Sequence, residues 1–469
     1  MKYQELRKKY PRFIYEKYSY KISGNSLEIF FNFKTEPNIK FQPKVIIENV
    51  GDRVLNPVRN RKFLNGVNNL IFHLGLMEIP SYWKATCSPE IVIKAGLLNK
   101  EQIKWWEDLI INGMGQFFYE NKINFRKPNF ITIKSKRDKN LPRFGLGRLH
   151  RGGILVPVGG GKDSAVTLEI LKKNKKQINC FSLNPSEAAK KIMKIAGCKN
   201  PIVVRRKIDE KLLALNRRGF LNGHTPFSAY LAFLSILCAV IFDQKYIAFS
   251  NERSSNEGNV KYLGKIINHQ YSKSFNFEKR FRKYSKKYLA KNIEYFSFLR
   301  PFYEIQIAKL FSKYPKYFSA FLSCNEAYKT ASGTKKPTKR WCGNCPKCLF
   351  VFTTLYPFVN KQKLIKIFGE NLFNKKLLST MQELIGERKF KPFECVGTKK
   401  ESLFAFYLSW KKSKSELPKE TPFLLKYFRN KVLPKYPSLE KEPQNFLNSW
   451  NNQHNLPKEF EKSLKKVVS

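Results

Sequence analysis

Between residues 154 and 300, short apolar runs alternate with segments whose apolar residues have helical spacing. The apolar runs predict strands at 154–158, 178–183, 202–208, 246–250 and 295–299. Helices are predicted at 162–173 and 185–196, and Thr225 followed by Pro226 predicts the capped start of another. This alternation is typical of an α/β fold with a doubly wound parallel sheet. Ligands of such sheets bind beyond the carboxyl ends of the strands, so residues after the first and fourth strands are the first site candidates.

The segments on either side have different patterns. Residues 1–134 predict an N-terminal α+β accessory domain, with strands at 27–33 and 44–49 and helical spacing at 72–86 and 105–119. A basic linker is expected at 135–153, where Arg143, Arg148 and Arg151 would be close enough to reach a phosphate at the first strand end. Residues 301–410 predict a helical region with a cysteine cluster, and 411–469 a Lys-rich helical tail that packs loosely.

Composition adds three expectations. The formal charge of +52 is compatible with a nucleic-acid partner, but the lysines are spread along the whole chain, which favours capture of small anionic substrates or a coding bias, so no nucleic-acid partner is expected. Three of the nine cysteines lie within seven residues and the others do not form a disulfide framework, which favours the reducing cytoplasm. The longest uncharged apolar stretch, 226–242, is short for a bilayer span, so we expect a buried helix and no membrane span.

A glycine loop joins the first predicted strand to its helix. Gly159, Gly160 and Gly161 are followed by Lys162, Asp163 and Ser164. Such a loop lets backbone N–H groups and a helix N-terminus approach a phosphate closely. The residue spacing fits neither a Walker loop nor a dinucleotide fingerprint, and the loop instead resembles the pyrophosphate loop of the PP-loop ATP pyrophosphatases, with Gly159 at the usual serine position.

The residues after the glycines suggest their own chemistry. Asp163 could hold the magnesium of MgATP, Ser164 could donate to a phosphate oxygen, and Lys162 could neutralise the departing pyrophosphate. The structural alternative is that Asp163 is a helix N-terminal charge and Ser164 a cap, and both readings can hold together.

A dense polar segment follows the fourth predicted strand. The candidate binding residues here are Asn251, Arg253, Asn256, Glu257, Tyr271 and Lys273. Glu252 or Glu257 could ligate metal or abstract a proton, and His269 is the best group to titrate near neutral pH. A solvated loop rarely combines so many functional side chains at a strand end, so an active site is predicted.

Four cysteines make a candidate metal site. Cys342, Cys345 and Cys348 form two Cys-x-x-Cys spacings that share Cys345, and Cys324 precedes them. Four sulfur ligands favour a closed, structural tetrahedral Zn²⁺, with a redox dithiol as the alternative.

Six segments together resemble the UDP-N-acetylmuramoyl-L-alanyl-L-glutamate epimerase family of bacterial peptidoglycan synthesis, within the PP-loop superfamily of HUP-like fold. They are residues 82–87, 159–164, 250–258, 268–274, 342–348 and 393–397. The resemblance implies ATP and Mg²⁺ as cofactors and a UDP-muramoyl dipeptide as substrate. It implies adenylation of the terminal glutamate, release of pyrophosphate, proton exchange at the α-carbon, and hydrolysis to AMP and the D-glutamyl product.

The resemblance leaves the proton-transfer groups open. His269 with Glu252 is the first hypothesis, and Cys87 with Cys395 the second, since paired thiols suit cofactor-independent racemisation. One rival is a PP-loop enzyme that modifies tRNA or a nucleobase and would use the basic surface directly. Another is a zinc-stabilised nucleic-acid-binding module with a degenerate loop, but retention of Asp163 and Ser164 argues against it.

Overall fold

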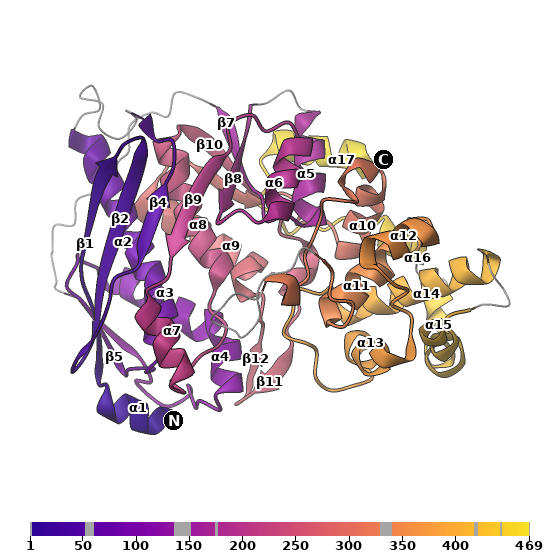
Figure 1. Ribbon diagram of the computed structural model, residues 1–469, viewed down its shortest axis with the longest axis horizontal. Helices are drawn as coiled ribbons and strands as arrows, with labels where there is room; N and C mark the ends of the chain where they lie inside the picture. Colours follow the sequence, from indigo (N-terminus) through magenta and orange to yellow (C-terminus); the bar gives the residue numbers. More distant parts are fainter. Residues whose placement is uncertain are drawn as a thin grey trace.

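The computed structural model describes residues 2–51, 61–135, 152–173, 177–328, 340–416, 421–440 and 443–468. Its centre is one eleven-stranded mixed sheet in the order β13-β10-β7-β8-β9-β4-β2-β1-β5-β6, with β3 paired to β2 (Figure 1). The strands are β1 Arg12–Ser23, β2 Ser26–Thr35, β3 Ile39–Phe41, β4 Lys44–Ile47, β5 Glu90–Ile93, β6 Thr132–Ser135, β7 Gly153–Pro157, β8 Ile178–Leu183, β9 Ile202–Lys207, β10 Gln244–Phe249 and β13 Glu294–Ser297. A separate hairpin contains β11 Val260–Tyr262 and β12 Lys265–Ile267.

The helices surround this sheet and extend beyond it on the carboxyl-terminal side. They are α1 Tyr3–Lys9, α2 Arg61–Trp83, α3 Lys100–Gly113, α4 Gly115–Glu120, α5 Lys162–Lys172, α6 Glu187–Ile195, α7 Glu210–Arg217, α8 Phe227–Ile241, α9 Phe275–Tyr284, α10 Glu304–Ser312, α11 Pro346–Leu355, α12 Lys361–Phe368, α13 Leu378–Ile385, α14 Lys399–Glu416, α15 Phe423–Tyr427, α16 Pro443–Leu447 and α17 Lys458–Val468. The helices α11 to α15 form a compact group beside the sheet (Figure 1). The fold is therefore α/β with a helical C-terminal region.

The strands from β13 to β9 pair in parallel and are covered on both faces. Successive residues of a strand point to opposite faces. Ile154 and Val156 of β7 accordingly pack in the core that includes α5, α6 and α10, whereas Leu155 packs in the core that includes α2 and α8. This arrangement confirms the expected doubly wound pattern for this part of the sheet.

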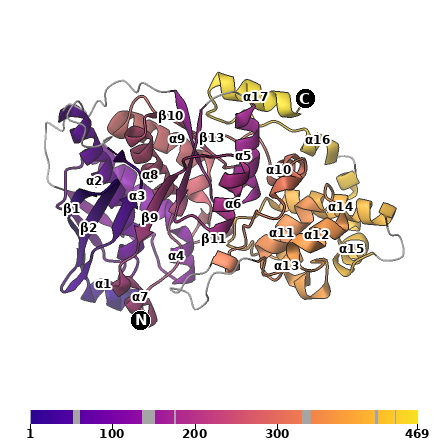
Figure 2. The same cartoon turned by 45° about the horizontal axis from the view of Figure 1, so that its top comes forward.

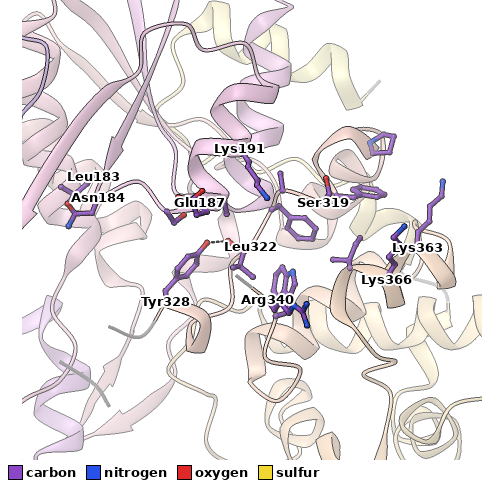
Figure 3. A pocket seen from close by; sticks show the side chains of 18 of the residues that line it. Leu183, Asn184, Glu187, Lys191, Ser319, Leu322, Tyr328, Arg340, Lys363 and Lys366 are labelled. Atoms are coloured by element: carbon purple, nitrogen blue, oxygen red, sulfur yellow. Dashed lines mark hydrogen bonds between the residues drawn. The ribbon is translucent and has the colours of Figure 1, made fainter. Parts of the chain in front are cut away.

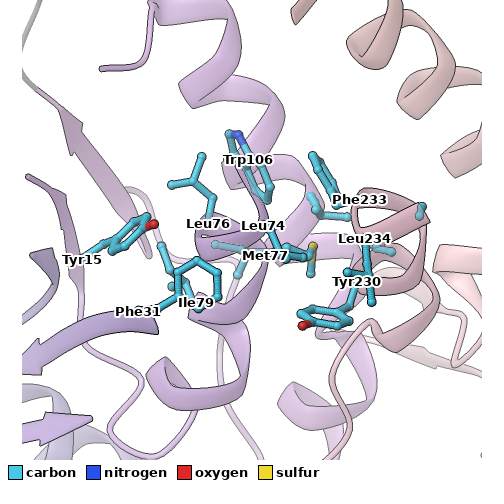
Figure 4. Close-up of a cluster of buried hydrophobic side chains, with 14 of the residues drawn as sticks. Tyr15, Phe31, Leu74, Leu76, Met77, Ile79, Trp106, Tyr230, Phe233 and Leu234 are labelled. Carbon is cyan, nitrogen blue, oxygen red and sulfur yellow. The ribbon is translucent and has the colours of Figure 1, made fainter. Parts of the chain in front are cut away.

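The same sheet continues into the N-terminal strands. β4 pairs antiparallel with β9, with Ile47 opposite Val204. The helix α2 then lies between the N-terminal strands and α8, and its Leu74 and Met77 are buried between aromatic side chains from both (Figure 4). Residues 1–134 and the parallel strands thus share one sheet and one hydrophobic core.

Two expectations about local structure were wrong. Thr225 does not cap α8: Pro226 is the N-cap residue and no side-chain cap bond forms, because the chain turns one residue later than the sequence signal predicts. The C-terminal tail does not pack loosely, since α17 packs on α5 and Phe460 lies edge-on to Tyr246 with ring centroids 5.0 Å apart (Figure 2). A disulfide joins Cys180 on β8 to Cys198 after α6, which become neighbours only through packing of α6 on the sheet.

The structure also bears on the apolar stretch 226–242, but not on the arginines of the basic linker. The stretch 226–242 forms the buried helix α8, and no helix in the described ranges has the length and apolarity needed to cross a bilayer. Arg143, Arg148 and Arg151 lie outside the described residues.

Candidate active site

The glycine loop lies between the end of β7 and the start of α5. Gly160 has a φ of +98°, and a Cβ on it would lie 2.8 Å from the backbone nitrogen of Ala189 on α6. At Gly159, by contrast, a Cβ would meet nothing within 4 Å. Gly160 is therefore required by the turn, whereas position 159 has room for a side chain such as serine.

The first turn of α5 presents the donors expected at a helix N-terminus. Ser164 Oγ donates to the carbonyl of Gly161 at 2.9 Å, so its hydroxyl fastens this turn. The segment between α10 and α11 also holds the loop in place, because Leu322 N donates to Gly160 O at 2.9 Å. A rigid cradle of backbone N–H groups suits an anion.

Lys162 points into the protein rather than into solvent. Its side chain is 2% exposed, and its Nζ contacts carboxylate oxygens of Asp163 and Glu304. Burial alone would lower the pKa of Lys162, but the two carboxylates outweigh it and the pKa is raised. Burial would raise the pKa of Glu304, but the neighbouring ammonium groups of Lys162 and Lys347 hold it down to about 2. Lys162 and Glu304 therefore form a charged pair under the loop, which the sequence did not reveal.

Lys347 extends this buried network. Its Nζ lies 3.5 Å from Glu304 Oε1 and also donates to the carbonyl oxygen of Cys395. Because Lys347 stands between Cys345 and Cys348, the network links the glycine loop to the cysteine cluster.

Glu252 follows β10 and is buried, with 4% of its surface exposed. No hydrogen bond to its carboxyl group occurs among the described residues. Burial and the nearby Glu304 raise its pKa to about 7, although Lys273 acts in the opposite direction. A carboxyl group that titrates near neutral pH can both take and give a proton.

The raised pKa of Glu252 predicts a pH-dependent stability change. A carboxyl whose pKa is higher in the folded than in the unfolded state stabilises the fold below the unfolded value, and this contribution is lost as pH rises through about 7. We expect Glu252→Gln to be more stable than the parent protein at pH 8, by about 2 kcal/mol, with a smaller difference at pH 5. Urea unfolding at both pH values measures the difference. The exposed Glu5→Gln is the control, and an equal effect of Glu252→Gln at both pH values would contradict the prediction.

The other polar residues after β10 mostly make local contacts. Asn251 Nδ2 donates to Ser297, the Arg253 guanidinium lies over the Tyr303 ring, Asn256 bonds to the backbone of Arg253 and Phe275, Glu257 pairs with Lys391, and Tyr271 donates to Asn276. Lys273 is the member directed to the buried network: its Nζ is 3.1 Å from Cys395 Sγ. The sulfur and Glu252 outweigh the effect of burial and raise the pKa of Lys273.

Arg300 joins the two halves of this polar segment. It is fully buried and donates to the backbone carbonyls of Glu252 and Lys273. Its charge is balanced by Glu278, whose Oε2 lies 3.1 Å from Nη2. A single arginine in an apolar segment is not recognisable as a site residue from sequence. Only the hydrogen bonds of Arg300 to the backbone at Glu252 and Lys273 reveal that it holds the two segments together.

His269 and Cys395 lie together, whereas Cys87 lies elsewhere. His269 Nε2 is 3.9 Å from Cys395 Sγ, and burial together with Lys273 and Lys391 lowers the pKa of His269 to about 3. Cys87 is fully buried against Arg7, and burial raises its pKa to about 12. The structure thus groups Cys395 with His269 and Lys273, and it gives Cys87 a separate, closed environment.

The four predicted cysteine ligands converge. The sulfur atoms of Cys324, Cys342, Cys345 and Cys348 all lie within 4.8 Å of one another. Four sulfurs at such distances could hold a metal ion, and the donor set fits a tetrahedral Zn²⁺.

A cavity of about 990 Å³ opens beside the loop (Figure 3). Its wall contains Leu322, which is bonded to Gly160, and Tyr328, whose hydroxyl donates to the Leu322 carbonyl at 2.8 Å. Aromatic and basic side chains line the rest, among them Trp341, Arg340, Lys191, Lys363 and Lys366. Such a lining suits a flat base with attached phosphates. None of the site residues predicted from sequence lines it, because its walls come from α6, α12 and the segment before the cysteines.

The chain is similar to known proteins over most of its length. The family model for the MurL N-terminal domain matches residues 4–298, and that for the MurL C-terminal domain matches 320–431. The UDP-N-acetyl-alpha-D-muramoyl-L-alanyl-L-glutamate epimerase of Xanthomonas oryzae pv. oryzae is 33% identical over 331 residues, or 70% of this chain and 72% of that protein. Proteins of the same name from Micromonospora sp. and Salinispora tropica are 37% and 32% identical, over 70% of this chain and 72% and 70% of their own lengths. No solved structure gives a significant match.

Proposed function

The chain belongs to the UDP-N-acetyl-alpha-D-muramoyl-L-alanyl-L-glutamate epimerase family. From this membership we propose how its site inverts the configuration at the α-carbon of the terminal glutamate. The protein is an isomerase that converts the terminal L-glutamate of UDP-N-acetylmuramoyl-L-alanyl-L-glutamate to D-glutamate. The family matches give no support to the tRNA- or nucleobase-modifying alternative.

The reaction begins with ATP at the glycine loop. An oxygen of the glutamate α-carboxylate attacks the α-phosphorus, the bond to the β-phosphate breaks, and pyrophosphate leaves as the acyl-adenylate forms. The loop N–H groups and the positive end of α5 stabilise the leaving pyrophosphate. The observation that carries this step is Gly160, whose turn holds the loop against α6 at the start of α5.

The cavity beside the loop supports binding of the nucleotide. Trp341 and Tyr328 offer flat apolar surfaces, and Arg340 and Lys191 offer positive charge. Asp163 is partly exposed and one of its oxygens contacts Lys162, so its other oxygen is available as a metal ligand. Mg²⁺ held there would neutralise phosphate charge.

Activation makes inversion feasible. Once the carboxylate is an acyl-adenylate, the enolate formed by loss of the α-proton no longer develops beside a full negative charge. A modest base then suffices. Glu252, which titrates near neutral pH within the buried network, is proposed as one proton-transfer group, and hydrolysis afterwards releases AMP and the D-glutamyl product.

The test is incubation with MgATP and UDP-N-acetylmuramoyl-L-alanyl-L-glutamate. We expect AMP and pyrophosphate to form with inversion of the terminal glutamate, measured by chiral chromatography after acid hydrolysis. Omission of ATP should abolish inversion. Inversion without ATP, or AMP formation without inversion, would contradict the proposed activation. The L-alanyl-D-glutamate epimer as starting material gives the reverse rate under the same conditions.

A further inference from the structure

Cys395 lies in a cluster of reactive side chains between α13 and α14. Its Sγ is 3.1 Å from Lys273 Nζ and 3.9 Å from His269 Nε2. A positive ammonium group at this distance stabilises negative charge on the sulfur.

The hydrogen bonds of His269 define which nitrogen faces the thiol. Gln116 Nε2 donates to Glu120 Oε1 at 2.7 Å, so the Gln116 Oε1 is the atom that contacts His269 Nδ1. An amide oxygen only accepts, and Nδ1 therefore carries the ring proton. This leaves the Nε2 lone pair directed at Cys395, where it can accept a hydrogen bond from the thiol.

Several buried polar atoms around Cys395 have no partner within the described ranges. Gln270, which is 4% exposed, donates through Nε2 to the carbonyl of Val396, but its Oε1 has no partner. His224 Nδ1 is likewise unpaired, and its ring lies 4.4 Å from that of His269. Buried polar groups are usually satisfied, so unpaired atoms from separate segments indicate a polar ligand that completes them.

We propose that Cys395 is a catalytic residue which exchanges the glutamyl α-proton on one face of the α-carbon, while Glu252 serves the opposite face. Lys273 connects the two groups, since it contacts the Cys395 sulfur and interacts electrostatically with Glu252. This inference rests on the proposed epimerase reaction, and it assigns His269 to the thiol rather than to the substrate.

The proton step balances without a redox change. One group, as thiolate or carboxylate, takes the α-proton, and the C–H electron pair moves into the enolate of the acyl-adenylate. The other group, in its protonated form, gives its proton to the opposite face. After turnover the first group holds an extra proton and the second lacks one, and exchange with water resets both.

Deuterium exchange from each substrate epimer tests the assignment. In D₂O with MgATP, Cys395→Ala should lose inversion by at least about 100-fold. It should still exchange the α-hydrogen of one epimer, whereas Glu252→Gln should exchange only the other. Pyrophosphate release is measured in the same reactions, because one-sided exchange requires that the adenylate still forms.

The controls separate this inference from the proposed function. If the parent protein neither releases pyrophosphate nor inverts the substrate, the proposed function itself fails. If the parent is active and Cys395→Ala inverts the substrate at the parent rate, the role of Cys395 is overturned. The same holds if Cys395→Ala and Glu252→Gln both lose exchange of the same epimer. Cys87→Ala is the matched thiol control and should keep normal exchange. Should Cys395→Ala fold poorly, Cys395→Ser is expected to give the same one-sided exchange.

Discussion

Replacement of Gly160 by alanine is expected to lower pyrophosphate release at least about 100-fold, a loss comparable to removal of a transition-state donor. The φ of +98° disfavours any side chain, and the new Cβ would lie 2.8 Å from the backbone nitrogen of Ala189. Backbone on a packed helix cannot move away as a flexible side chain can, so the loop itself must shift. Steady-state release of pyrophosphate with MgATP and substrate measures the loss.

Gly159 provides the matched control for Gly160. Its Cβ position is open, so Gly159→Ala and Gly159→Ser should keep pyrophosphate release within about threefold of the parent. Thermal unfolding should show that all three variants are folded. Equal losses at positions 159 and 160 would contradict a specific role of the Gly160 turn, and unchanged release in Gly160→Ala would indicate that the loop does not contact the phosphates.

We propose that the four cysteines hold a zinc ion, and replacement of Cys345 by serine is then expected to remove it and to destabilise the helices around it. Cys345 is the N-cap residue of α11, and its sulfur lies 3.5 Å from that of Cys348 and 3.9 Å from that of Cys324. Structural zinc contributes on the order of 10 kcal/mol of apparent binding energy, so loss of one ligand costs a large part of it. Elemental analysis should show about one zinc per parent chain and far less in the variant.

Asn344→Ala is the control for the metal site. Asn344 lies between two of the ligands and its side chain is exposed, so its removal should leave the zinc content unchanged. Limited proteolysis should cut Cys345→Ser, but not Asn344→Ala, within residues 340–416. Full zinc retention in Cys345→Ser would contradict a four-sulfur site. Because Lys347 stands between two ligands and reaches Glu304, zinc loss should also weaken the loop network.

The local elements were predictable because their signals are local. The apolar run 178–183 coincides with β8, and the run 154–158 differs from β7 by one residue at each end. Both are short, buried and bounded by turn residues, which is the situation in which an apolar run is informative. The long strand β1 was missed because its outer half alternates exposed and half-buried aromatic and charged residues, without a clear apolar face.

Pairings between distant segments were not predictable in the same way. The pairing of β4 with β9 joins residues far apart in the chain, and the sequence of neither strand indicates which strand it pairs with. The same holds for the buried charges: Lys162 and Glu304 are 142 positions apart. Sequence spacing therefore located the loop and the cysteine ligands, whose members are close together, but missed Glu304, Arg300 and Lys347.

The junction of β4 with β9 also constrains how the chain reaches its native state during translation. Until Ile202–Lys207 has emerged from the ribosome, the edge of β4 has no strand to cover its free backbone groups. An uncovered edge invites pairing with other chains. The nascent N-terminal segment is thus exposed to aggregation for a long part of synthesis, and a chaperone that shields sheet edges should raise the yield of folded protein.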